Sequence, residues 1–370
     1  MENALKVRDI AACLEAWAPR QHAESYDNVG LLVGSMDAAV TQVMVSLDCT
    51  EAVVEEAVEA GCQMVVSHHP LIFKGLKRLT GSNEVERTAM LALRHNVALY
   101  AIHTNLDNVK SGVNWTLATS VGCNPHSLSI LRPMGADLEK WTVFVPHAHV
   151  DSVRTAMADA GAGHIGQYDQ CSFSTQGEGT FRAQEGANPF VGAIGELHRE
   201  PESRLEMVVP GDHSAAVFRA MSEAHPYEEV AYDRVLLQQR RDDLGAGMVG
   251  ELDAAMPWEA FADHVKETLG CGAIKHTAPV KDMVKRVAVC GGSGAFLIAD
   301  AKRAGADVYI TSDVKYHEYF GADGQIQLLD VGHYESEWQT SGLISNKIKE
   351  IFPNFAVRLS QTRTNPVSFR

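Results

Sequence analysis

The sequence lacks long apolar runs, paired cysteine motifs and an excess of basic residues. None of its 370 residues fall in an apolar run of about 18 or more, which argues against a membrane span. The first residues include an early acid and no apolar stretch before a cleavage-like site, so we read no signal peptide. Its seven cysteines are odd in number and form no CxxC pair, which indicates free thiols in a reducing cytoplasm.

The charge balance also excludes a class of partners. The formal net charge is −15, whereas broad contact with a nucleic-acid backbone needs a basic face. A local basic pocket remains compatible with this value. The hydrophobic fraction of 45% and the charged fraction of 21% are those of a folded soluble protein. A length of 370 residues favours two or three domains over one core.

The first clear structural unit covers residues 41–70. Alternating apolar residues predict a strand over 43–47. Thr50 is typical of a helix N-cap, and Gly61 is expected to end the helix that follows. The short apolar run MVVS then predicts a second strand. This order is a β-α-β unit, which favours a parallel sheet.

Residues 286–313 repeat the same pattern. With an offset of 244, the segment registers on residues 41–70 without a gap, and Gly61 meets Gly305. Convergence is the alternative explanation, because all β-α-β units share apolar patterning. The ungapped register favours an internal duplication.

The pattern of predicted strands and helices changes between about Lys140 and Gln239. Here the pattern is strand, helix, long loop, strand, helix and strand, which is typical of a ferredoxin-like α+β sandwich. The segment 167–189 is read as a hairpin or a loop. We therefore predict an α/β protein with two related lobes, residues 1–139 and 240–370, and an inserted α+β domain, residues 140–239.

Histidines and acids follow three of the predicted strands. His68 and His69 come directly after the MVVS strand, where side chains enter the ligand crevice of α/β proteins. Adjacent residues of an extended chain point in opposite directions, so the pair would best serve two different ions. His103 and Asp107 follow the strand ALYAI in the same way. Imidazole and carboxylate together suit a divalent transition metal.

The third cluster is GHYESE. His333 and Glu337 are four residues apart, so on a helix both side chains can reach one point. A glutamate can also bridge two ions about 3.5–4 Å apart. Each cluster alone is more often packing or surface than a ligand set. Their shared position after strands, in halves related by the repeat, is what favours a metal site.

Other motifs keep two interpretations. In TSDVKYHEY, Asp313 and His317 could form an outer shell around the metals, or Ser312 could cap a helix. CGGSG at 290–294 could cradle a phosphate, but it lacks the spacing of the known phosphate loops. The basic stretch FKGLKR could attract an anionic substrate, although a solvated loop is the favoured reading.

Several ordered motifs resemble the Nif-three-like dinuclear metal-centre family, also called the GTP cyclohydrolase type two homologs. The resemblance covers nearly the full length. AESYDNVGLLVG at 23–34 is similar to the family's N-terminal signature, with Tyr26 in place of tryptophan. The other matching motifs are SHHPLIFKGLKRLT, HTNLD, TSDVKYHE and GHYESE in the predicted lobes, and GAGHIGQYDQCSFSTQGEGTF and HPYEEVAYD in a PII-like insertion.

The resemblance carries expectations about metals, assembly and activity. It implies that two divalent ions bind to His68, His69, Asp107, His333 and Glu337, none of which departs from the family pattern. It also implies a homohexameric toroid whose metal sites face an internal cavity. The name suggests GTP cyclohydrolase activity, but no residue set here independently specifies a guanine pocket.

Three functions therefore compete. A metal-dependent hydrolase acting on a small molecule, such as a nucleotide or a phosphoester, is favoured by the chemistry. A non-enzymatic regulatory assembly would use the PII-like insertion to sense small molecules. A metal storage or delivery protein would exchange its ions readily. The ligand types suit Zn, Fe, Mn, Co or Ni and do not choose between them.

Overall fold

The computed structural model describes residues 5–134, 138–166 and 168–370. The chain forms two compact units, one made of residues 1–133 and 243–370 and the other of residues 134–242. Both contain helices and sheets, so the expected mixed α/β class is confirmed. Among the described residues, no helix combines the length and the apolar character needed to cross a membrane.

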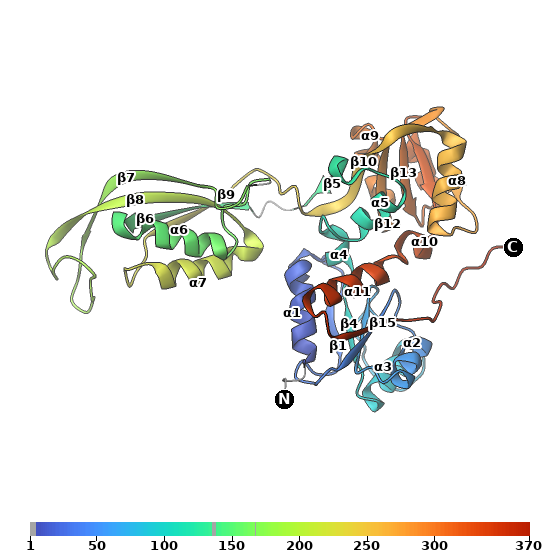
Figure 1. The fold of residues 1–370 in the computed structure, drawn as a ribbon, viewed down its shortest axis with the longest axis horizontal. Helices are drawn as coiled ribbons and strands as arrows, with labels where there is room; N and C mark the ends of the chain where they lie inside the picture. The colour runs from blue at the N-terminus through green and yellow to red at the C-terminus, as the bar shows by residue number, and fades with distance from the viewer. Residues whose placement is uncertain (1–4, 135–137, 167) are drawn as a thin grey trace. The chain divides into compact units, whose positions relative to one another are not determined.

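The first unit contains two sheets (Figure 1). The first has the order β1-β4-β3-β2-β15 and is parallel except for β1. Its strands are β1 (Gly30–Val33), β2 (Gln42–Ser46), β3 (Met64–Ser67), β4 (Ala98–Ala101) and β15 (Ala356–Leu359). Figure 1 shows two helices on each side of this sheet: α1 (Val7–Trp17) with α11 (Thr340–Ile351), and α2 (Glu51–Glu59) with α3 (Glu84–Arg94).

The second sheet has the order β11-β14-β13-β12-β10-β5. Its strands are β5 (Ser129–Pro133), β10 (Gly245–Pro257), β11 (Lys275–His276), β12 (Met283–Ser293), β13 (Val308–Ser312) and β14 (Gln327–Asp330). Apolar side chains of α5 (Val113–Ser120) and α8 (Trp258–Leu269) pack on one face, and those of α9 (Ile298–Arg303) pack on the other. Each sheet thus buries both faces, as parallel strands require.

The two sheets repeat the pairing that the sequence register predicts. Val43 of β2 pairs with Met64 of β3, and Val287 of β12 pairs with Val308 of β13. Both pairs are parallel, and an offset of 244 superposes one on the other. As expected, the side chain of Thr50 caps α2 by accepting a hydrogen bond from the amide of Val53, and Gly61 has a positive φ just past the helix.

The lobe boundaries predicted at 139 and 240 miss an exchange of strands. Strand β5, from the first half of the chain, pairs with β10 in the second sheet. Strand β15, near the end of the chain, pairs with β2 in the first sheet. Local patterns predict that these segments are extended, but their partners are decided by packing between distant parts of the chain. Each sheet therefore contains residues from both halves.

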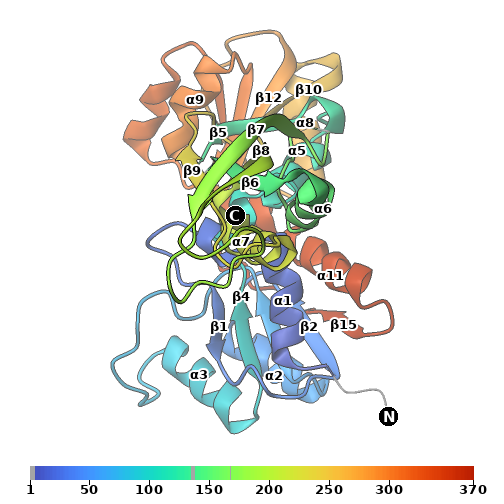
Figure 2. The ribbon, with the colours of Figure 1, turned by 90° about the vertical axis from the view of Figure 1, so that its left-hand side faces the viewer.

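The second unit is a four-stranded antiparallel sheet with two helices. The strands are β6 (Leu138–Pro146), β7 (Ser172–Arg182), β8 (Leu197–Pro210) and β9 (Tyr232–Leu236), in the order β7-β8-β6-β9. Helices α6 (Val150–Asp159) and α7 (Ser214–Ala224) lie on the same side of this sheet (Figures 1 and 2). The ambiguous segment 167–189 contains β7, which pairs with β8 along its whole length.

Candidate metal centre

Four imidazoles meet within the first unit. His68 and His69 leave the end of β3, His103 precedes the short helix α4 (Thr104–Asn108), and His333 begins α10 (His333–Glu337). The ring centroids of His68 and His69 are 5.0 Å apart, and those of His69 and His333 are 5.2 Å apart. The His103 ring lies 5.2 Å from that of His68 and 5.3 Å from that of His69. The strand ends thus meet as their positions in the sequence predict.

Each of these rings is held through its Nδ1 atom. The acceptors are the Ile102 carbonyl oxygen for His68 (2.9 Å), Asp48 for His69 (2.7 Å), Asp27 for His103 (2.9 Å) and Asp313 for His333 (2.7 Å). An acceptor at Nδ1 favours the tautomer with its lone pair on Nε2. The Nε2 atoms of all four rings are therefore available as ligands.

Two carboxylates complete the cluster. Oε2 of Glu337 lies 3.0 Å from Nε2 of His69 and 3.1 Å from Nε2 of His333. Oδ1 of Asp107 lies 3.6 Å from Nε2 of His68. Ligand atoms within 4.8 Å of one another form three groups that could hold an ion: His68, His69 and His103; His69, His333 and Glu337; and His68, Asp107 and Glu337. Glu337 belongs to two of these groups.

Two buried polar atoms in the cluster have no hydrogen-bond partner. Among the described residues, both Nε2 of His68 and Oδ1 of Asp107 are buried and unsatisfied. An unpaired buried donor or acceptor costs about 1–3 kcal/mol, and a charged one costs more. A cation between them would satisfy both atoms. This donor set therefore fits a divalent metal ion.

The pKa shifts of Asp107 and His68 are those expected of groups whose positions favour a bound cation. Burial, together with the nearby charge of Glu337, raises the pKa of Asp107 well above its usual value. Burial lowers the pKa of His68 to about 3, so its ring is neutral and ready to act as a ligand at neutral pH.

Protons and cations compete for the other two rings. Burial alone would lower the pKa of His69, but hydrogen bonds to Asp48 and Glu337 raise it to about 10. Hydrogen bonding to Glu337 likewise outweighs burial and raises the pKa of His333 to about 9. Without a metal, a proton shared with Glu337 occupies the place that an ion would take.

The glycine-rich segment 290–294 makes room for Glu337. A Cβ added at Gly292 would lie 2.4 Å from Oε1 of Glu337, and Gly292 has a φ of +62°. The amide of Gly292 donates to the hydroxyl of Ser336, and that of Gly294 donates to Thr311. Because these amides are already bonded within the protein, the phosphate-cradle interpretation is wrong. Gly292 instead leaves the space that the Glu337 carboxylate occupies.

A pocket of about 660 Å³ opens onto the cluster. His69, His103 and His333 line it together with aromatic side chains and Lys275, whose ammonium lies 2.7 Å from Asp330. The segment after β15 forms one wall through Asn365, Pro366, Val367 and Phe369. It is tied to the site where the hydroxyl of Thr364 donates to Asp48 and the side-chain Nδ2 of Asn365 donates to Oε1 of Glu335. This wall has no apolar periodicity, and sequence reasoning missed it.

The structure brings all five predicted ligands together. The three predicted outer residues lie in different positions relative to these ligands. Asp313 lies behind His333, whereas His103 stands among the inner rings. His317 is exposed, its ring contacts Tyr316 and Phe320, and it belongs to none of the three ligand groups named above.

The cap prediction for Ser312 is wrong, because Lys315 occupies the N-cap position of the short helix that follows. The hydroxyl of Ser312 donates instead to the carbonyl oxygen of Gly292. Asp27 and Asp48 were not predicted. The signal for Asp27 is its place in the YDN motif, and the signal for Asp48 is its position directly after the strand β2.

Comparison with known proteins places the chain in one family along nearly its full length. Residues 5–366 match the family model described as Duf34/NIF3 (NGG1p interacting factor 3). A Bacillus subtilis protein named GTP cyclohydrolase 1 type 2 homolog is 38% identical over 375 residues, covering 100% of each chain. A Mycobacterium bovis protein of the same name is 35% identical, covering 98% of this chain and 97% of the relative.

Solved structures of related proteins have the same fold along the whole chain. The crystal structure of a Bacillus cereus protein related to NIF3 has 36% identity and a TM-score of 0.88, with full coverage of both chains. A Staphylococcus aureus protein has 30% identity and a TM-score of 0.79, also with full coverage.

Proposed function

This chain belongs to the Duf34/NIF3 family, and we propose that it is a hydrolase that depends on two divalent metal ions. The observation that carries the proposal is the position of Glu337: like His68 and His69 it takes part in two of the three ligand groups, and as a carboxylate it alone of these can bridge two ions. A carboxylate shared between two groups is the arrangement expected of a bridging ligand in a two-metal centre.

The ligands divide between two ions. We assign one ion to His69, His333 and Glu337, and the other to His68, Asp107 and Glu337. The neighbours His68 and His69 then serve different ions. His103 lies beside the second group and can complete it. Imidazole and carboxylate ligands suit Zn, Fe, Mn, Co or Ni.

The surrounding residues prepare this site for hydrolysis. When bound, two such ions lower the pKa of a water molecule and polarise a phosphoryl or carbonyl group. Asp48 and Asp313 fix the orientation of His69 and His333 through their Nδ1 atoms. The adjacent pocket of about 660 Å³ has room for a small molecule, and bound cations would attract an anionic group there.

The substrate class that we propose is a nucleotide or another phosphoester. The relatives' printed name makes GTP the first compound to test. The test combines metal analysis of protein from its native host with a screen of nucleotides and phosphoesters. His69→Ala should lose the ion that this ligand holds, and turnover with it, whereas His317→Ala, an exposed histidine outside the cluster, should keep both ions and turnover. Turnover that survives complete removal of metal from the parent protein would exclude this function.

A second candidate is a regulatory assembly. The β-α-β-β-α-β order of residues 134–242 supports the assignment of this unit as a ferredoxin-like, PII-like insertion. In this case metal-loaded protein would bind a small molecule saturably without turnover. We also propose a homohexamer, which light scattering on the eluted protein would test. Metals that exchange within seconds would instead indicate storage or delivery.

A further inference from the structure

A second pocket, of about 790 Å³, lies wholly within the unit 134–242. It occupies the sheet face opposite α6 and α7. On β6, Trp141, Val143 and Val145 are fully buried in the core shared with the two helices, whereas the neighbouring Phe144 lines the pocket. The chain after β7 and the turn before β9 form its other walls. Its size is typical of a small-molecule site.

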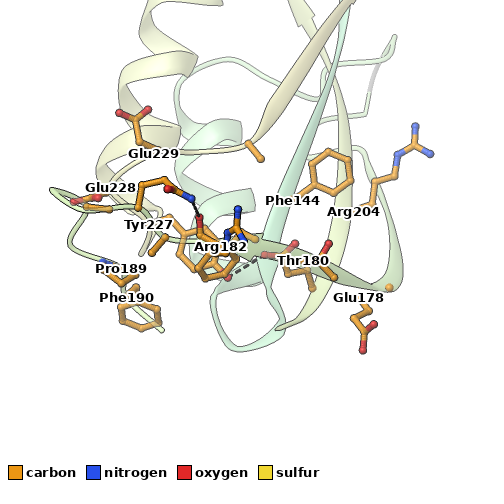
Figure 3. Close-up of a pocket in the computed structure, with 18 of the residues that line it drawn as sticks. Phe144, Glu178, Thr180, Arg182, Pro189, Phe190, Arg204, Tyr227, Glu228 and Glu229 are labelled. Atoms are coloured by element: carbon orange, nitrogen blue, oxygen red, sulfur yellow. Dashed lines mark hydrogen bonds between the residues drawn. The ribbon is translucent and has the colours of Figure 1, made fainter. Parts of the chain in front are cut away.

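Aromatic rings form much of the lining. The ring of Tyr227 lies 6.0 Å from that of Phe181 and 6.3 Å from that of Phe190. Figure 3 shows Phe190 and Tyr227 toward one end of the pocket and Phe144 toward the other. The Phe190 side chain is 54% exposed, although large apolar side chains are usually covered. The faces of such rings carry partial negative charge and attract cations.

A buried carboxylate stands among these rings. Glu202 is only 8% exposed, and its Oε1 accepts a hydrogen bond from the Tyr227 hydroxyl at 2.9 Å. Its other oxygen, Oε2, lies against Gly179, where an added Cβ would stand 2.0 Å away. Gly179 therefore leaves the space that the carboxylate occupies. A buried carboxylate is costly unless a donor or a cation compensates it.

The charges around the pocket are also predominantly acidic. Four carboxylates line it, from Glu178, Glu202, Glu228 and Glu229, against the guanidinium groups of Arg182 and Arg204. Arg204 pairs with Glu206, which is not a lining residue, at 2.7 Å, and Glu178 pairs with Arg199 at 2.6 Å. The remaining lining charges are three carboxylates against the single cation of Arg182.

We propose that this pocket binds an organic cation, in which a quaternary or protonated ammonium group is attached to an apolar body. The ammonium group lies near Glu202 and the faces of Tyr227 and Phe181, and the apolar body contacts Phe144 and Phe190. This site is separate from the metal centre, which lies wholly within the other unit.

The first experiment compares three probes of similar size by calorimetry on the full, metal-loaded protein at low salt. They are benzyltrimethylammonium, neutral benzyl alcohol and anionic 3-phenylpropionate. We expect saturable binding of the cation with an affinity at least about ten-fold above that of either control, since cation–π and carboxylate attraction act together.

Matched variants locate the binding. Glu202→Gln keeps the shape of the side chain but removes the charge, and should weaken binding of the ammonium probe about ten-fold or more. Gly179→Ala should displace the carboxylate and weaken binding as well. Gly177→Ala is its control: Gly177 also lines the pocket, but the nearest atom to the new Cβ is the Glu202 carbonyl oxygen at an ordinary 3.9 Å, so the carboxylate stays in place. All three variants should keep the metal content of the parent protein.

Two results would overturn the proposal. The first is equal affinity for the charged and neutral probes, or an affinity that Glu202→Gln leaves unchanged. The second is the absence of saturable binding of any probe together with burial of Phe190 in a contact with a second copy of the chain. Thermal unfolding of each variant checks that lost binding does not reflect lost folding.

Discussion

Oε2 of Glu337 lies 3.0 Å from Nε2 of His69, although 268 positions separate the two residues in the chain. His69 follows a strand of the first sheet, and Glu337 follows a strand of the second. The candidate centre therefore forms only when both sheets are folded and packed together. Metal content is in this sense a reporter of the folding of the whole first unit.

Sharing of Glu337 predicts a specific pattern of metal loss. His333→Ala removes a ligand from one group only, so about one ion per chain should be lost. Glu337→Gln removes the ligand common to two groups and should lower the affinity for both ions by about 10-fold or more. Metal analysis after dialysis against buffer measures both effects. Equal ion content in the two variants would contradict a bridging role for Glu337.

Gly292→Ala should impair the centre although it replaces none of the proposed ligands. The new methyl group would meet the Glu337 carboxylate at 2.4 Å, so the carboxylate must move away from His69 and His333. Metal affinity should fall by about 10-fold or more. Gly305→Ala is the matched control, because its φ of +69° imposes similar backbone strain but its Cβ would have no neighbour within 4 Å. Similar metal affinity in the two variants would show that backbone strain alone explains the effect.

Removal of the metals should destabilise the protein. Chelation leaves the carboxylates of half-buried Asp107 and buried Glu337 close together, with unsatisfied atoms on Asp107 and His68. Ions present at about 100 times their Kd stabilise the folded state by about 2.7 kcal/mol. We therefore expect Tm to fall by roughly 5–10 °C on chelation, as measured by calorimetry, and to recover when a divalent ion is restored. His69→Ala, which removes a ligand of one assigned ion only, should show a smaller fall in Tm on chelation than the parent protein.

Acid should weaken the loop that precedes α3. The Glu86 carboxylate accepts hydrogen bonds from the Thr80 amide and hydroxyl, both at 2.8 Å, and from the Ser82 amide at 3.1 Å. These bonds, led by that from the Thr80 amide, lower the pKa of Glu86 from 4.5 to about 2.

Because the pKa of Glu86 is lower in the folded state, its contribution to stability is fully present above about pH 4.5. It is lost as the pH falls toward about 2. Glu86→Gln should therefore lower the free energy of unfolding at neutral pH and flatten its dependence on pH in this window. Denaturant titrations at several pH values measure this. A variant with the same pH slope as the parent would contradict the role of Glu86.

The sequence predicted the candidate ligands of the site better than the acids that orient their rings. His68, Asp107 and His333 each follow a strand closely, so the carboxyl ends of parallel strands bring them to one place. Asp27 contacts the ring of His103 from 76 positions away in the sequence, and Asp48 contacts the ring of His69 from 21 positions away. No local pattern distinguishes an acid that orients a histidine from one that faces water.

The fold was predictable to the same extent. The β-α-β pattern around Val43 recurs around Val287, and both strands pair as the repeat indicates. The exchange of β5 and β15 was not predictable, because the choice of strand partner is a non-local property. The C-terminal wall of the pocket was missed for a related reason, since its position depends on hydrogen bonds to Asp48 and Glu335.

The point of insertion of residues 134–242 has a consequence for modularity. Pro133, at the end of β5, pairs directly with Gly245, at the start of β10, so the chain leaves and re-enters the first unit at neighbouring positions. To its host, the whole insertion is equivalent to an enlarged hairpin loop, and the free-energy cost of closing a loop grows only slowly with length. An accessory domain can therefore be exchanged, shortened or replaced by a tight turn there while the host unit keeps its own architecture.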